Sequence, residues 1–167
     1  MQKQAREIHN IKTITQIGLL IALSIIGATI KIQGSIAFDS MAAFFAALYI
    51  NPLAGGVVGI LGHLISSATA GFPLTLPMHI LIGIQMFAFV YIFGWLYEKT
   101  PGGIPVVVAT LLNGPMAALT VVPMSLMLGL PFSGWPLFMV IWLPLTIASF
   151  ANILLAVILY RSISRGR

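Results

Sequence analysis

Two histidine rings stand in an otherwise apolar stretch of the chain, GHLISSATAGFPLTLPMH at residues 62–79. His63 precedes the central sequence Gly71-Phe72-Pro73 and His79 follows it. A neutral imidazole carries one hydrogen-bond donor and one acceptor, and it is the side chain that most readily changes charge near neutral pH. Two such rings flanking one turn point to ligand binding, with bonding between neighbouring helices as the alternative.

Few other side chains in the sequence could take part in binding. Asp39 is an acidic residue that stands apart from Glu7 and Glu98, and Lys31 and Gln33 precede it in the same segment. Thr75 lies in the same stretch as the histidines, and Asn113 precedes Gly114-Pro115, a pair that interrupts a helix. We expect these side chains to bind one polar ligand together. The alternative for Lys31 and Asp39 is an interfacial ion pair, which would contribute little to stability.

The same inventory argues against catalysis. A lone Asp39 leaves no paired-carboxylate site, and the sequence has no H-E-x-x-H zinc motif and no glycine-rich phosphate loop. The chain has no cysteine, and two histidines without a carboxylate or thiolate complement do not make a metal site. We therefore expect no metal, no cofactor and no enzyme activity, although a small intramembrane enzyme or a structural membrane subunit remains an alternative.

The composition places these residues in a membrane. Hydrophobic residues make up 59% of the chain and charged residues 7%, with a mean hydropathy of +1.07. A soluble domain carries several times more charge. The net charge of +5 comes mostly from the two tails, which favours a role in membrane topology over nucleic-acid binding.

The elements that must position the candidate residues are six apolar segments. We expect spans near residues 13–30, 40–50, 52–70, 75–97, 104–130 and 136–160, of which the second is short. The prediction is a single all-α integral membrane domain over residues 1–167, a bundle of six transmembrane helices. Of the eight Lys and Arg residues only Lys31 falls outside the tails and the loop with Lys99, so both termini are expected to be cytoplasmic.

This topology places Gly71-Phe72-Pro73 at an outer turn and both histidines in the outer half of the membrane. Asn152 falls in the inner half of the last span, so we expect it to bond neighbouring helices rather than to line an outward pocket. Trp135 and Phe72 lie near the outer face, where an aromatic ring can stack on a flat ligand or belong to the interfacial aromatic belt. The sequence thus indicates an outward-facing receptor for a small molecule.

At the level of the whole chain, these features resemble the substrate-binding S components of energy-coupling factor (ECF) vitamin transporters. The segment IAFDSMAAFFAALYINPLAGGVVGILGHLISSATAGFPLTLPMH, residues 36–79, is similar to S components for the lower-ligand precursors of cobalamin. The F-D-S entry, the N-P-L-A-G-G turn and the G-H-L…G-F-P-L-T-L-P-x-H block carry this resemblance. It implies an uncharged aromatic ligand, α-ribazole or 5,6-dimethylbenzimidazole, or else another vitamin such as a thiamine precursor, riboflavin, pantothenate or cobalamin.

The resemblance also implies partners. S components dock on a membrane-embedded T component through small residues of the first helix, and Gly18 and Ala22 have that spacing here, with Ser24 and Ala28 one step further. Two ATPase subunits would supply the energy, and the S component would topple in the lipid bilayer to deliver its ligand. We expect a multi-pass protein of a bacterial cell membrane.

Overall fold

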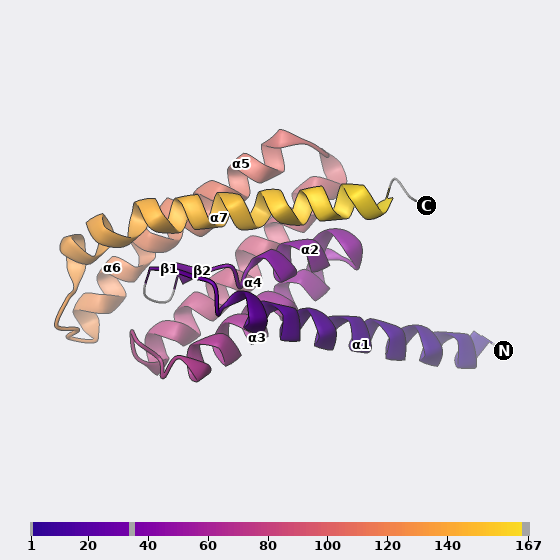
Figure 1. Cartoon of the computed structure of the whole chain (residues 1–167), viewed down its shortest axis with the longest axis horizontal. Helices are drawn as coiled ribbons and strands as arrows, with labels where there is room; N and C mark the ends of the chain where they lie inside the picture. The colour runs from indigo at the N-terminus through magenta and orange to yellow at the C-terminus, as the bar shows by residue number, and fades with distance from the viewer. Residues whose placement is uncertain (1, 34–35, 165–167) are drawn as a thin grey trace.

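Helices account for nearly all of the structure. The computed structural model describes the backbone of residues 2–33 and 36–164, and the side chains of residues 11–30 and 36–164. Figure 1 shows the long helices running side by side, with α1 beginning and α7 ending at the same end of the molecule. In chain order the elements are α1 (Gln2–Gly27), β1 (Lys31–Gln33), β2 (Ile36–Ala37), α2 (Met41–Tyr49), α3 (Pro52–Thr69), α4 (Leu76–Lys99), α5 (Gly103–Leu111), the π-helical segment η1 (Leu112–Met116), α6 (Ala117–Met127) and α7 (Gly134–Ser164).

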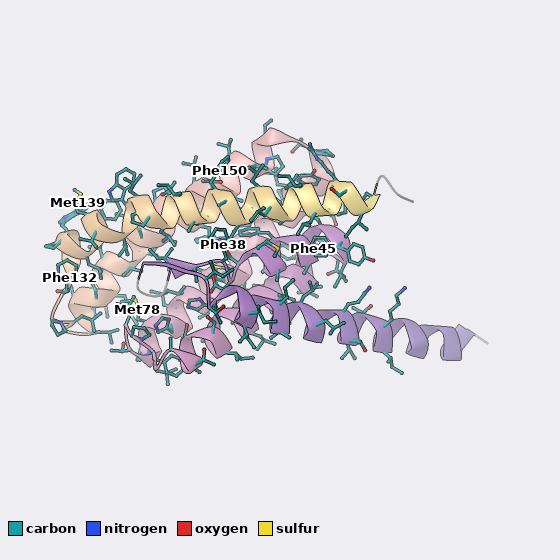
Figure 2. All side chains as sticks on the ribbon, in the orientation of Figure 1. Phe38, Phe45, Met78, Phe132, Met139 and Phe150 are labelled. Carbon is teal, nitrogen blue, oxygen red and sulfur yellow. The ribbon has the colours of Figure 1, made fainter. Side chains whose placement is uncertain are left out.

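Four helical stretches are long and apolar enough to cross a membrane. They are α3, α4, α7 and the continuous helix formed by α5, η1 and α6, while the apolar part of α1, Ile11–Gly27, is shorter. Apolar side chains cover the outside of the bundle, and Figure 2 shows Met139 and Phe150 projecting away from α7. Such an apolar exterior is suited to lipid, so the chain is a multi-pass membrane protein.

The second predicted segment, residues 40–50, is a helix but is not among these four stretches. Helix α2 has nine residues, so its axis is about 14 Å long, roughly half of the hydrocarbon core. Its alanines and Phe44 are buried against other helices rather than exposed to lipid. The chain leaves α2 at Asn51-Pro52, where the Asn51 side chain caps α3 by accepting a bond from Ala54 N (2.8 Å). The second segment is therefore a core helix enclosed by its neighbours.

The loop between α1 and α2 contains a small element that the all-α prediction did not include. Strands β1 and β2 pair antiparallel, with Lys31 opposite Ala37 and Gln33 opposite Ile36. Two further bonds fix the chain that leaves this hairpin: Phe38 N donates to Ile30 O (3.2 Å), just before β1, and the Ser24 hydroxyl of α1 donates to Asp39 O (2.6 Å). The hairpin thus delivers Asp39 to the start of α2 in a fixed position.

The predicted interruption of the fifth span is confirmed. The residues around Asn113-Gly114-Pro115 form η1, a π-helical turn between α5 and α6. Pro115 has no backbone N–H to donate, and a wider turn accommodates its ring without ending the helix. A Cβ on Gly114 would lie 2.9 Å from the Cα of Thr146, so glycine here allows α7 to approach η1 closely. The close approach brings polar residues of the two elements into contact.

Close packing between α2 and α3 generates a test of this fold. A Cβ added to Gly55 would lie 2.5 Å from the Cβ and 2.7 Å from the Cα of Ala47, and backbone atoms cannot move aside as a flexible side chain can. We expect Gly55→Ala to lower the free energy of unfolding by about 1 to 3 kcal/mol, the usual cost of overpacking. Thermal unfolding of the purified protein in detergent measures it.

The matched control is Gly103→Ala at the start of α5, where an added Cβ meets no atom within 4 Å. It should leave the melting temperature unchanged or slightly raised, because alanine loses less backbone entropy than glycine on folding. Equal effects of the two substitutions would contradict the contact between α2 and α3.

Candidate binding site

A central cavity lies between the hairpin, α3, α4, η1, α6 and α7. Its volume is about 90 Å³ and its wall is mostly apolar. Such a cavity, mainly apolar with a few convergent polar groups, is the usual form of a small-molecule site. The lining residues are Ile36, Ala37, Asp39, Ser40, His63, Leu74, Ile82, Gln85, Met86, Asn113, Ala117, Val121, Ile141, Leu145, Ala148, Ser149 and Asn152.

Asp39 and His63 lie together at one polar corner of this cavity. The distance from His63 Nδ1 to Asp39 Oδ2 is 3.6 Å, which is an electrostatic contact but longer than a hydrogen bond. Both side chains are largely buried, at 9% and 13% exposed. Burial strengthens the interaction of any ligand donor with this carboxylate, because little water competes for it. The structure thus brings together Asp39 and His63, two of the predicted binding residues.

The two histidines meet each other rather than converging separately on the cavity. His63 Nε2 and His79 Nδ1 are 3.1 Å apart, and their ring centroids are separated by 5.3 Å. The Ser67 hydroxyl lies between them, 3.2 Å from His63 Nε2 and 3.0 Å from His79 Nδ1, and donates to His63 O (2.7 Å). His79 is completely buried and is not part of the cavity wall. Only His63 therefore faces the cavity, with His79 behind it.

The turn between α3 and α4 closes over His79. Leu74 N donates to His79 Nε2 at a distance of 3.4 Å, and the Phe72 ring packs 5.7 Å from the His79 ring. Phe72 and Thr75 have positive φ angles of 50° and 74°, a conformation that side chains other than glycine rarely adopt, least of all a β-branched one. The contacts with His79 help to hold this strained turn in place.

Asn152 occupies a different place from the predicted one. It lines the cavity, and its side chain also bonds three backbone groups: it accepts from Met41 N (2.9 Å) and donates to Ala37 O (3.2 Å) and Ala148 O (2.8 Å). The sequence analysis placed Asn152 too deep in the last span to line a pocket. Helix α2 is short, however, so its start lies deep in the bundle, where Asn152 can reach it. The expected bonding role stands, since Asn152 caps the N-terminus of α2 from α7.

Two other polar residues line the cavity from the helices opposite. Asn113 of η1 donates to the Ser149 hydroxyl (3.1 Å), which donates back to Asn113 O (2.9 Å). Gln85, which the sequence did not single out as a ligand contact, donates to Thr120 Oγ1 (2.5 Å) and leaves its Oε1 without a partner among the described residues. The apolar residues of a span look alike in the sequence whether they face lipid or the cavity. The polarity of Gln85 was therefore the signal that could have identified it as a cavity residue.

Several predicted contacts are not brought to the cavity. Thr75 is exposed, and Phe72 reaches His79 but does not line the cavity. Trp135 is 58% exposed and packs edge-on against Phe138, the position of an interfacial aromatic. The side chains of Lys31 and Gln33 lie outside the described residues.

A second, outer pocket adjoins the central cavity. It lies between the ends of α1 and α3, has a volume of about 510 Å³, and shares Ala37 and His63 with the central cavity. Hydroxyl groups line it, and those of Thr29 and Thr69 donate to backbone carbonyls of their own helices, which leaves the oxygens free to accept. The remaining lining residues are Ile25, Ala28, Ser66, Ser67 and Ala70.

The order Asp39, His63, Ser67 has the pattern of a hydrolase triad, but its hydrogen bonds do not favour nucleophilic catalysis. The Ser67 proton goes to the backbone carbonyl of His63, and the ring nitrogen that would have to take this proton is also faced by His79. A nucleophile needs its hydroxyl directed at a free base and at a substrate carbonyl. Among the described residues, no cluster of three or more acidic, histidine or cysteine side chains could hold a metal ion.

Comparison with protein families gave one match. The family model of the ECF transporter substrate-specific component matches residues 12–164, which is nearly the whole chain. Comparisons with curated proteins and with solved structures gave no match.

The bonds of Asn152 predict a large effect on stability. Asn152→Leu leaves the Met41 N–H and the Ala37 carbonyl buried without their partner, and an orphaned buried group costs about 1 to 3 kcal/mol. We expect the free energy of unfolding to fall by about 2 to 4 kcal/mol, measured by thermal or denaturant unfolding in detergent. Asn51→Ala removes an exposed helix cap and should cost only about 1 kcal/mol. A smaller effect of Asn152→Leu than of Asn51→Ala would refute the capping role.

Proposed function

We propose, because the chain belongs to the family of substrate-specific components of ECF transporters, that it captures a small aromatic vitamin precursor from outside the cell. The best candidates are 5,6-dimethylbenzimidazole and its nucleoside α-ribazole. The observation that carries this proposal is the central cavity, which is apolar except for the corner of Asp39 and His63 and the amides on the opposite wall.

The size of the cavity favours a small planar ligand. One buried water needs about 10–15 Å³ on this measure, so the cavity of about 90 Å³ has room for roughly six to nine waters. A fused bicyclic base is of this size, whereas riboflavin and cobalamin are far larger. The apolar side chains of α4, α6 and α7 would contact the ring faces, and a ring N–H would donate to Asp39.

The outer pocket offers a place for the sugar of a nucleoside. A base in the central cavity can carry a substituent past His63 and Ala37, the residues that line both spaces. The hydroxyl oxygens of Thr29, Ser66 and Thr69 would then accept bonds from ribose hydroxyls. This arrangement supports α-ribazole as well as the free base, whereas a thiamine precursor or pantothenate offers no bicyclic ring to fill the cavity.

Ligand-induced stabilisation tests this function. The purified protein is heated with a panel of vitamins and precursors, and a true ligand raises the melting temperature because it binds only the folded state. We expect 5,6-dimethylbenzimidazole and α-ribazole to stabilise the protein, and riboflavin and cobalamin to have no effect. His63→Ala should weaken the affinity for both ligands about tenfold or more, since the Asp39 carboxylate that accepts from the ligand loses the ring beside it.

The result that would reject this choice of ligand is stabilisation by another vitamin alone. Absence of stabilisation by every compound in the panel would favour the structural-subunit alternative. A chemically altered product after incubation would favour the intramembrane enzyme.

We further propose that the ligand is delivered by docking of α1 on a membrane-embedded T component driven by two ATPase subunits, with the whole S component toppling in a bacterial cell membrane. Gly18 and Ala22 are exposed on α1, and an added Cβ on Gly18 would meet no atom within 4 Å. Ser24 and Ala28, one step further along, are buried, and Ser24 lies against Asp39 and Gly62 of α3, so they do not extend this face. Small exposed residues allow a partner helix to approach closely.

Bulk at this surface should uncouple uptake from binding. Gly18→Leu or Ala22→Leu should abolish uptake of α-ribazole by cells while ligand affinity stays within about twofold, because the substituted side chains face away from the cavity. Ala68→Leu, an exposed position on α3, is the matched control and should leave uptake unchanged. Loss of affinity together with uptake would mean that this face of α1 packs within the protein.

A further inference from the structure

We propose that His79 is a positioning residue that fixes the proton of His63 on Nδ1, so that His63 presents a donor to Asp39 at the wall of the cavity. His79 does this without contact with the cavity, from which His63 separates it. The role deepens the proposed function, because the ligand contact it prepares rests on that function. The assignment of the proton itself depends only on the hydrogen bonds of the unliganded protein.

The first step fixes the proton of His79. Its Nε2 faces the backbone N–H of Leu74 at 3.4 Å, and a backbone amide can only donate. Nε2 of His79 therefore accepts and carries no proton. A neutral imidazole has one proton, so in His79 that proton lies on Nδ1.

The second step transfers this assignment to His63. Nδ1 of His79 stands 3.1 Å from Nε2 of His63, and two N–H groups cannot point at each other over that distance. His63 Nε2 therefore carries no proton, whether the His79 N–H donates to that nitrogen or to the Ser67 oxygen. The remaining position for the proton of neutral His63 is Nδ1, the atom that faces Asp39 Oδ2.

Ser67 supports the arrangement without determining it. Its hydroxyl proton is committed to His63 O at 2.7 Å, so its oxygen acts as an acceptor toward the two rings. The Ser67 oxygen can accept a hydrogen bond from an N–H at either His63 Nε2 or His79 Nδ1. It therefore does not select a tautomer of His63. Asp39 favours a proton on the same nitrogen, His63 Nδ1, from the other side, but at 3.6 Å, which is longer than a hydrogen bond, it acts less strongly than the contact between the two rings at 3.1 Å. The ring of His79 is therefore the stronger of the two influences.

The consequence concerns the carboxylate that a ligand would meet. With the proton on Nδ1, His63 turns a positive edge toward Asp39 Oδ2, which holds the carboxylate and leaves Oδ1 for a ligand donor. With the proton on Nε2, the lone pair of Nδ1 would face the carboxylate, and the two would repel. A preorganised acceptor binds more tightly, because no reorientation is needed when the ligand arrives.

The experiment compares two amide replacements of His79. The side chain of Asn places an N–H donor where His has Nδ1, whereas the side chain of Gln places its amide where His has Nε2 and leaves nothing at Nδ1. His79→Asn should therefore keep the His63 proton on Nδ1, and His79→Gln should release it to Nε2, where Ser67 can accept it. Nitrogen-15 NMR of histidine-labelled protein reads the protonated nitrogen directly, and His9→Gln identifies the resonances of the third histidine.

Affinity for 5,6-dimethylbenzimidazole supplies the second measurement. We expect His79→Gln to weaken binding about tenfold and His79→Asn to stay within about threefold of the unsubstituted protein. Val90→Ala, a fully buried change on the same helix, controls for general destabilisation and should lower the melting temperature while leaving both the tautomer and the affinity unchanged. Ser67→Ala should also keep the proton on Nδ1.

The proposal is overturned if unliganded His63 carries its proton on Nε2, or if His79→Gln leaves the proton on Nδ1. It is also overturned if His79→Gln shifts the proton and the affinity stays the same, since the positioning would then serve no binding. If the tautomer shifts as expected and the unsubstituted protein binds neither candidate ligand, the assignment of the proton is supported and the choice of ligand fails instead.

Discussion

The side chain of Asn152 is the single group on which the architecture around the cavity most depends. Lipid offers no hydrogen-bond partner. A backbone N–H without an intrahelical partner, at the start of a short buried helix, must therefore find an acceptor inside the protein. Ser40, at the N-cap of α2, makes no side-chain cap, and Asn152 supplies the acceptor from α7 instead. The same amide holds the end of the hairpin through Ala37 O, so one residue joins three elements at the wall of the cavity.

Several of the buried polar residues that the structure describes are bonded by a neighbour from another element. The pair of Asn113 and Ser149 joins η1 to α7, Gln85 and Thr120 join α4 to α6, and the histidines join α3 to α4. These bonds lie around the cavity rather than at the lipid surface. A cavity wall built in this way keeps its shape when empty, which lowers the entropy lost on binding.

The sequence predicted the membrane class, four of the spans and the disturbance of the helix at Gly114-Pro115. It placed α2 and its shortness but did not show that this helix is enclosed by its neighbours, because an apolar helix of nine residues inside a bundle has the same composition as the middle of a span. It could not separate the roles of His63 and His79, since their helical positions say how deep they lie but not which ring stands in front. The apolar lining of the cavity was also out of reach, because spans that are apolar all round do not reveal which side faces lipid.

The shortness of α2 constrains the order in which the protein can assemble. The long helices can each enter a bilayer alone, since their backbone groups are bonded within the helix and their length matches the hydrocarbon. Helix α2 cannot, because its ends would lie unbonded in the lipid interior and its alanines would gain little from lipid contact. It reaches its native state only when α3, α4 and α7 are present to surround it, and α7 is the last helix of the chain. The cavity is therefore completed only after α7 has been made, so a chain cut short by loss of α7 would insert into the membrane without the central cavity.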